Sequence, residues 1–147
     1  MREILLEGDK LKEILPQKAR MALLDRLISV DKEAKIAESE ADICRDNLFF
    51  DCDLGGVPSW IGIEMIAQTV AASSAVLSEK TKSGMVLSVT NYSAKEPIFC
   101  DGDTLKIQVR QDFVSEPIFR YEGVIYRGEE ELVRGKITVA QGDFNGQ

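Results

Sequence analysis

Residues 57–78 read VPSWIGIEMIAQTVAASSAVLS, a run with a single charge, that of Glu64. The length would suit a membrane span, but Gly62, Gln68 and four serines make the run too polar for one. Small and apolar residues on every side predict a slim helix that is apolar all round, with Pro58 in its first turn. Such a helix must be enclosed, so we expect it to form the core inside a strongly curved sheet.

The rest of the chain carries the apolar pattern of strands. The expected strands are residues 21–30, 36–43, 84–93, 104–110, 119–127 and 132–140. The last two form a hairpin around 128–130, and residues 8–15 predict a short helix that Asp9 caps and Pro16 ends. About six antiparallel strands around one long helix define an α+β fold. No repeat or linker interrupts residues 1–147, which predicts a single domain.

Composition and charge exclude several classes of protein. Among 147 residues, 18 Lys and Arg stand against 25 Asp and Glu, and the net charge of −7 disfavours binding to nucleic acid. The chain has no histidine, which excludes Ser-His-Asp and Cys-His catalysis and every metal site that needs a histidine ligand. Without a glycine-rich nucleotide motif or a metal cluster, no metal site and no cofactor are expected.

The cysteines and the first residues indicate a cytoplasmic protein. The three cysteines lack CxxC spacing, so we expect free, buried thiols in a reducing compartment rather than disulfides or a zinc site. Five of the first ten residues are charged and no long apolar stretch follows them. This pattern predicts no secretory signal.

Glu64 is the residue of the long helix that most needs an explanation. Burying an unpaired carboxylate costs several kcal/mol. This cost is comparable to the whole free energy of unfolding of a small domain. Gln68 lies on the same helical face, so the two form either a structural pair or a site in which a raised pKa suits Glu64 to proton transfer. Just before the helix, Gly55 and Gly56 would let backbone N–H groups approach a ligand at the positive end of the helix dipole and polarise an acyl carbonyl.

Three stretches resemble one family. Residues 56–68, GVPSWIGIEMIAQ, are similar to the central motif of the hot-dog-fold 3-hydroxyacyl-(acyl carrier protein) dehydratases, most closely the aryl-polyene-cluster branch. Residues 15–26 resemble the family's LPHRxPMLLxDR opening, and residues 96–105 its PVxPGDxL turn. The resemblance implies a hot-dog fold in a homodimer with active sites at the subunit interface. In that family a loop histidine removes the C2 proton and a helix Glu or Asp of the other subunit protonates the leaving hydroxyl; Glu64 and Gln68 match the motif.

The family's histidine has no counterpart in this chain. Where the family has GHFPxHP, residues 47–54 read NLFFDCDL, and Gln17 replaces the LPHR histidine. The ordinary His/Glu mechanism is therefore impossible within this chain. Three functions stay open: a dehydratase whose second group is Asp51 or Asp53, or whose Glu64 acts twice; an acyl-CoA thioesterase using Glu64 alone; or a catalytically silent acyl-binding protein, free or paired with an active paralogue.

The expected substrate is an acyl thioester on acyl carrier protein or CoA, as in fatty-acid or polyene biosynthesis. The expected catalytic residues are Glu64, Gln68 and Asp51. The expected substrate-binding residues are Phe50, Gly55, Gly56, Val57, Pro58 and Trp60. A carrier protein is itself acidic, so docking would need a local basic patch on this acidic chain. Residues that could supply the patch are Lys10, Lys12, Lys18, Arg20, Lys80 and Lys82.

Overall fold

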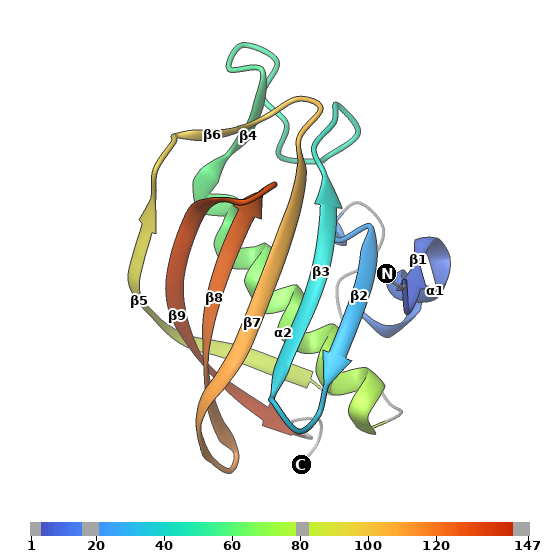
Figure 1. The fold of residues 1–147 in the computed structure, drawn as a ribbon, viewed down its shortest axis with the longest axis vertical. Helices are drawn as coiled ribbons and strands as arrows, with labels where there is room; N and C mark the ends of the chain where they lie inside the picture. Colours follow the sequence, from blue (N-terminus) through green and yellow to red (C-terminus); the bar gives the residue numbers. More distant parts are fainter. Residues whose placement is uncertain (1–3, 16–20, 79–82, 143–147) are drawn as a thin grey trace.

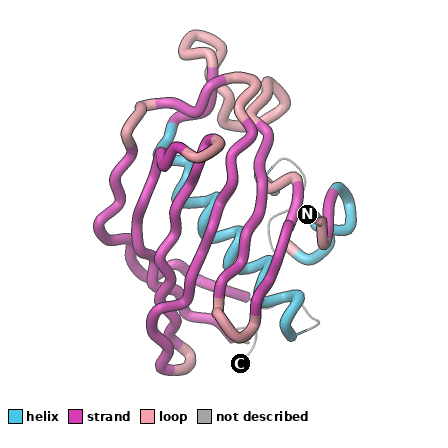
Figure 2. The backbone as a smooth tube through the Cα atoms, viewed as in Figure 1, coloured by secondary structure: helices cyan, strands magenta, loops and turns pink. Residues whose placement is uncertain are grey.

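The computed structural model describes residues 4–15, 21–78 and 83–142. One long helix, α2 (Gly62–Ser78), lies against the inner face of a seven-stranded antiparallel sheet in the order β1-β2-β3-β7-β8-β9-β5 (Figure 1). The sheet curls around the helix, so that strands from both halves of the chain cover it (Figure 2). The strands of this sheet are β1 (Leu6–Glu7), β2 (Arg26–Asp31), β3 (Ile36–Asp42), β5 (Ser83–Ala94), β7 (Thr104–Ser115), β8 (Ile118–Arg127) and β9 (Glu130–Gly142).

Smaller elements complete the fold. Strands β4 (Gly56–Pro58) and β6 (Ile98–Cys100) form a two-stranded ladder, and a single 3₁₀ turn, η2 (Ser59–Ile61), joins β4 to α2. A short helix, α1 (Gly8–Ile14), lies outside the sheet beside β1 and β2 (Figure 1). The predicted α+β hot-dog architecture, a helix wrapped by a curved antiparallel sheet, is confirmed.

The helix forms the centre of the core, as its composition predicts. Met65, Ile66 and Val70 are buried on α2, and the alternating side chains of β7 are buried with them. The segment 59–77 is long and apolar enough to cross a membrane, but 56% of the tested window is buried inside the fold. Burial of that kind is typical of a core helix in a globular protein.

The elements differ from the predicted ones at several ends. The long helix begins at Gly62 rather than at Pro58, because residues 56–58 pair with β6 and η2 intervenes. Strand β2 begins at Arg26 rather than at residue 21. The main sheet has seven strands instead of about six because Leu6–Glu7 adds one at its edge.

The short helix α1 begins and ends differently from its predicted caps. Its N-cap residue is Glu7 and makes no side-chain capping hydrogen bond, so the prediction that Asp9 caps the helix is wrong; Asp9 lies in the first turn. Leu15 follows the helix with ψ of 139°, the extended backbone favoured before a proline. Pro16, predicted to end this helix, lies outside the described residues.

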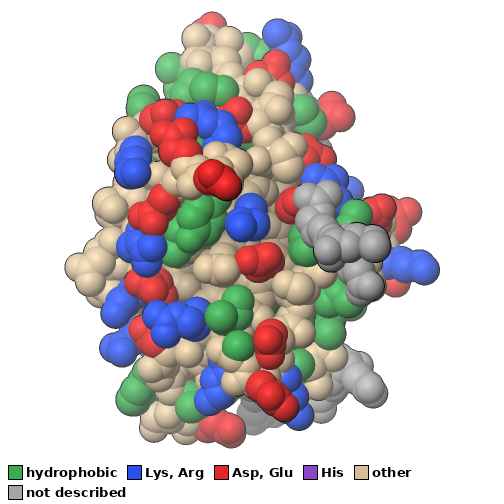
Figure 3. All heavy atoms as spheres, in the orientation of Figure 1, with side chains coloured by type: hydrophobic (Ala, Val, Ile, Leu, Met, Phe, Trp, Pro, Cys, Tyr) green, Lys and Arg blue, Asp and Glu red, His purple; other side chains and the backbone are tan. Residues whose placement is uncertain are grey.

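The outer face of the sheet is covered by paired charges. Arg110 bonds Glu122 on the neighbouring strand at 3.1 Å, and Arg134 reaches the same carboxylate from the other side at 3.1 Å. Asp112 is held in the same way by Arg120 and Lys136. Figure 3 shows blue and red side chains alternating over this face. These arginines form ion pairs with residues on neighbouring strands, and such pairs stabilise the sheet modestly.

The β4–β6 ladder requires glycine at position 56. Gly56 lies opposite Cys100, and a Cβ at Gly56 would meet the backbone carbonyl of Phe99. Backbone atoms cannot move aside as the end of a flexible side chain can. The ladder therefore sets how closely residues 56–58, and with them the start of η2, approach β6.

We expect Gly56→Ala to lower the free energy of unfolding by about 3 kcal/mol, as overpacking of a fixed core does. The matched control is Gly84→Ala on β5, where a Cβ would lie 3.8 Å from its nearest neighbour. The control should change stability by no more than about 0.5 kcal/mol. Urea unfolding of both variants measures the difference, and equal effects would show that β4 can shift.

Candidate functional site

The site is centred on Glu64 in the first turn of α2. Its carboxylate Oε1 accepts a hydrogen bond of 3.1 Å from the Nε2 of Gln68, one helical turn further on. Glu64 is half-buried, whereas Gln68 is fully buried. The predicted Glu64–Gln68 hydrogen bond is confirmed, and Glu64 remains partly exposed, whereas its catalytic role stays a prediction.

Gln68 connects Glu64 to a second segment of the chain. Its Nε2 also donates to the carbonyl of Met21 at 2.7 Å, and its Oε1 accepts from the N–H of Leu23 at 2.7 Å. Every polar atom of this buried amide is thereby used, as a buried polar group requires. Gln68 therefore ties Glu64 and residues 21–23 to each other, and its predicted catalytic role stays a prediction.

A charge network fixes the chain directly after this segment. Arg26 bonds Glu40 at 2.7 Å and Asp42 at 2.9 Å. Its guanidinium lowers the pKa of Asp42, whereas burial raises the pKa of neighbouring Asp25. The Asp25 carboxylate also accepts the N–H of Asp42 at 2.7 Å. The network locks the start of β2 to β3 and so supports the backbone that Gln68 holds.

Tyr92 of β5 fixes the other side of the helix start. Its hydroxyl donates to the carbonyl of Ser59 at 2.6 Å, and burial raises its pKa to about 12, so it stays a donor at neutral pH. A side chain at Gly62 would collide with that hydroxyl. Glycine at position 62 therefore lets β5 approach the turn that precedes Glu64.

Asp51 lies on the exposed loop before β4 and organises that loop. Its Oδ1 accepts the N–H groups of Asp53 at 2.9 Å and Leu54 at 3.2 Å, the pattern of an Asx turn. Its backbone carbonyl accepts the N–H groups of Gly55 and Gly56. The carboxylate thus has a structural task, and its predicted catalytic role stays a prediction.

The two glycine N–H groups do not lie where the sequence suggested. Gly55 and Gly56 were expected at the positive end of the helix dipole, facing a ligand. This prediction is wrong, because both N–H groups bond Asp51 and the residues of β4 and η2 separate them from α2. Position 55 favours glycine for another reason, because its φ of 77° lies in the left-handed region that side chains disfavour.

The other predicted substrate-binding residues have different degrees of exposure. Val57 is fully buried, Phe50 and Pro58 are half-buried, and Trp60 is 63% exposed on η2. A tryptophan this exposed beside the helix start is unusual for a residue that packs only within its own protomer. A role for these side chains in substrate binding stays a prediction.

The cysteines are free thiols, as predicted, but they are not buried. Cys44 and Cys52 are exposed and Cys100 is half-exposed, because they lie on the loops and short ladder above the core. Within the described ranges, no group of three or more Asp, Glu and Cys side chains is arranged to hold a metal ion.

A long helix wrapped by an antiparallel sheet, with a carboxylate in the first helical turn, is the arrangement of the hot-dog dehydratases. The model of the ApeP-like family, described as ApeP dehydratase, matches residues 9–147. The chain therefore belongs to the ApeP-like dehydratase family.

Relatives and solved structures agree with this assignment. The 3-hydroxyacyl-[acyl-carrier-protein] dehydratase FabZ of Bacillus thuringiensis is 27% identical over 95% of this chain and 98% of its own length. The FabZ of Fusobacterium nucleatum is 25% identical over 88% and 93%. The structure titled the dehydratase heterocomplex ApeI:P from Xenorhabdus doucetiae has a TM-score of 0.82 at 27% identity, with 91% of each chain covered. A probable thioesterase from Bartonella henselae, at 20% identity, 77% and 95% coverage and a TM-score of 0.57, shares the fold alone.

Sequence reasoning missed the groups that hold the site together. The partners of Gln68 are backbone atoms of residues 21–23, and backbone groups leave no mark on residue types. The role of Tyr92 has one trace in the sequence, a glycine at position 62 of an otherwise helical stretch, where close approach of another element is the usual reason.

We expect Gln68→Leu to cost about 3 kcal/mol of stability, because it leaves the buried Leu23 N–H without its partner and removes the bond to the Met21 carbonyl. The matched control is Gln108→Leu, whose amide bonds Glu38 at 2.8 Å on a partly exposed strand and should cost under about 1 kcal/mol. Thermal and urea unfolding compare the two. A Gln68 variant as stable as the control would show that residues 21–23 are held by other contacts.

Proposed function

We propose that this chain supplies the acid, Glu64, to a dehydratase of 3-hydroxyacyl thioesters whose base comes from a second subunit. The observation that carries the proposal is the carboxylate held by Gln68 at the start of α2 in a chain without any histidine. The predicted activity needs two groups, one to take the C2 proton and one to protonate the leaving hydroxyl. This chain provides a positioned candidate for the second.

The base is best supplied from outside this chain. Asp51 was predicted as a second group, but its Oδ1 already accepts two backbone N–H groups in an exposed turn. The resemblance to the dehydratases implies sites in which the acid of one subunit meets the loop histidine of the other. A histidine-bearing hot-dog subunit would complete the site at Glu64, whereas the site built on this chain's own loop would have no imidazole.

The free edge of β5 is the surface best suited to a partner subunit. β5 pairs with β9 on one side, and within the described residues no strand pairs with its other edge. Met85, Val86 and Leu87 are 56%, 41% and 49% exposed in succession. An open apolar edge of this kind favours pairing with another chain. Tyr92 connects the same strand to the turn before Glu64, so the edge lies near the site.

Two kinds of partner fit this edge. A second copy would give the predicted homodimer, in which both sites have Glu64 and neither has histidine. A histidine-bearing paralogue would give a mixed pair with one complete site. The solved neighbour titled a dehydratase heterocomplex supports the mixed pair. The homodimer suits the alternative chemistry, hydrolysis of an acyl-CoA thioester with Glu64 as nucleophile or base.

The substrate is the 3-hydroxyacyl thioester of an acyl carrier protein or of CoA, in fatty-acid or polyene biosynthesis. The FabZ relatives named above support the carrier-bound form. Of the six basic residues predicted to dock a carrier, Lys10 and Lys12 lie on α1, and the other four lie outside the described residues. The relationship to the FabZ dehydratases supports a soluble, cytoplasmic protein.

The test of the proposal follows a 3-hydroxyacyl thioester on CoA and on carrier protein by mass spectrometry. This chain alone should not remove water, and its complex with a histidine-bearing hot-dog subunit of the same organism should. Glu64→Gln should slow the complex by at least about 100-fold, the scale of a lost general acid. The matched control is Glu129→Gln in the exposed β8–β9 turn, which should leave the rate unchanged.

Other products would select the alternatives. Release of free thiol by this chain alone, lost in Glu64→Gln, would make it a thioesterase. Loss of water from the substrate with this chain alone would indicate that Glu64 or Asp51 serves as the base. A dehydration rate of the complex that does not change in Glu64→Gln would contradict the proposal. This chain would then be a catalytically inactive subunit that stabilises its partner.

We expect Val86→Lys with Leu87→Lys to convert the assembled protein to a monomer, because two charges on the edge of β5 oppose strand pairing. Light scattering at micromolar concentration measures the mass. The matched control is Phe113→Lys, since Phe113 is equally exposed, at 50%, on the β7–β8 hairpin away from this edge. A control that dissociates while the β5 variant stays assembled would place the interface on that hairpin.

A further inference from the structure

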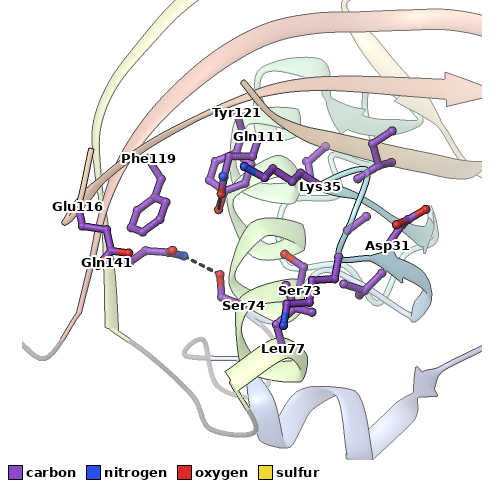
Figure 4. A pocket seen from close by; sticks show the side chains of 15 residues that line it. Asp31, Lys35, Ser73, Ser74, Leu77, Gln111, Glu116, Phe119, Tyr121 and Gln141 are labelled. Carbon is purple, nitrogen blue, oxygen red and sulfur yellow. Dashed lines mark hydrogen bonds between the residues drawn. The ribbon is translucent and has the colours of Figure 1, made fainter. Parts of the chain in front are cut away.

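A second cavity lies far from Glu64, between the C-terminal half of α2 and the inner face of the sheet (Figure 4). Its volume is about 450 Å³, within the usual range of small-molecule sites. Ser73, Ser74 and Leu77 line it from the helix, and Ser74 follows Glu64 by ten residues, about 15 Å along the helix axis. The cavity is therefore separate from the Glu64 site.

The floor of the cavity is a connected set of polar side chains. Gln141 donates to the hydroxyl of Ser74 at 2.9 Å, and the Tyr121 hydroxyl interacts with Ser74 and with Gln111. Burial raises the pKa of Tyr121, and its protonated hydroxyl donates to the Oε1 of Gln111 at 3.4 Å. The amide N–H₂ of Gln111 adds further donors on the same side. The hydrogen bonds within the floor fix the Gln111 amide, so that its N–H₂ group can donate to a molecule in the cavity.

Lys35 places a positive charge above that floor. It lies in the turn between β2 and β3 with a φ of 60°, and Figure 4 shows its amine directed toward Gln111 and Tyr121. Among the described residues, no carboxylate lies within ion-pair distance of this amine. Asp31 also lines the cavity, but its Oδ1 is occupied by the N–H groups of the same turn at 3.0 Å.

The remaining walls are mixed, because Lys32 and the carboxylate of Glu116 line the cavity together with apolar side chains. Leu77 and Phe119 face the cavity from α2 and β8, and Val30 and Ile36 face it from the β2–β3 hairpin. The Lys35 amine and the Gln111 N–H₂ lie at one place, with apolar surface beside them, and suit a ligand that carries an anionic group on a short hydrocarbon. The donors match the oxygens of a carboxylate, and the walls match an alkyl chain.

We propose that this cavity is a second binding site, which takes a medium-chain carboxylate with its anionic group at Lys35 and its chain along Leu77 and Phe119. The probes are octanoate and octan-1-ol, which share a chain and differ in charge. Titration of the isotope-labelled protein, followed by amide chemical shifts, should move residues 73–77 and 35–37. Octanoate should bind at least about 10-fold more tightly than octanol.

Variants separate the two parts of the site. Lys35→Met should remove the preference for octanoate and leave octanol binding unchanged, whereas Lys10→Met on α1 should change neither. Leu77→Trp at the exposed rim should weaken both ligands by filling the cavity. Glu64→Gln should leave octanoate binding intact, which keeps this test independent of the proposed dehydratase function.

Several results would overturn the assignment. They are an absence of octanoate binding, equal affinity for octanoate and octanol, or shifts confined to residues 60–68 at the other end of the helix. Thermal unfolding of Lys35→Met confirms that the variant is folded, so that an unchanged preference for octanoate in it would also contradict the proposal.

Discussion

A helix that is apolar on nearly every side has to be covered on nearly every side, and this requirement shapes the whole molecule. No flat sheet could enclose α2, so the seven strands curl around it and bring β2 and β5, from opposite halves of the sheet, into contact with the same helix. The cost of burying a polar atom in such a core explains why Gln68 uses all its hydrogen-bonding capacity. The position of Glu64 follows from that constraint.

The arrangement of the site separates chemistry from support. Glu64 is the proposed acid, and Gln68, Tyr92 and the Arg26 network fix the backbone around it from three different elements. These groups are already in place before a substrate arrives, so the reaction spends no free energy on reorganising them. In the proposed mixed dehydratase, this support would keep the acid in place while the base comes from the other chain.

The sequence predicted the features that depend on residue type and missed those that depend on backbone contact. The composition of residues 57–78 is sufficient to predict an enclosed helix, and the spacing of Glu64 and Gln68 predicts their hydrogen bond. The start of the helix was predicted too early because proline is as suitable for a strand end as for a first helical turn. The N–H groups of Gly55 and Gly56 were misplaced because nothing local shows that Asp51 binds them.

The open edge of β5 also bears on how the cell must make this protein. A chain that leaves synthesis without a partner presents twelve residues of strand with three apolar side chains in a row. Unpaired edges of this length are templates for aggregation. Under the proposed assembly, balanced production of the chains that share this edge is a condition for solubility, imposed by one strand rather than by the reaction.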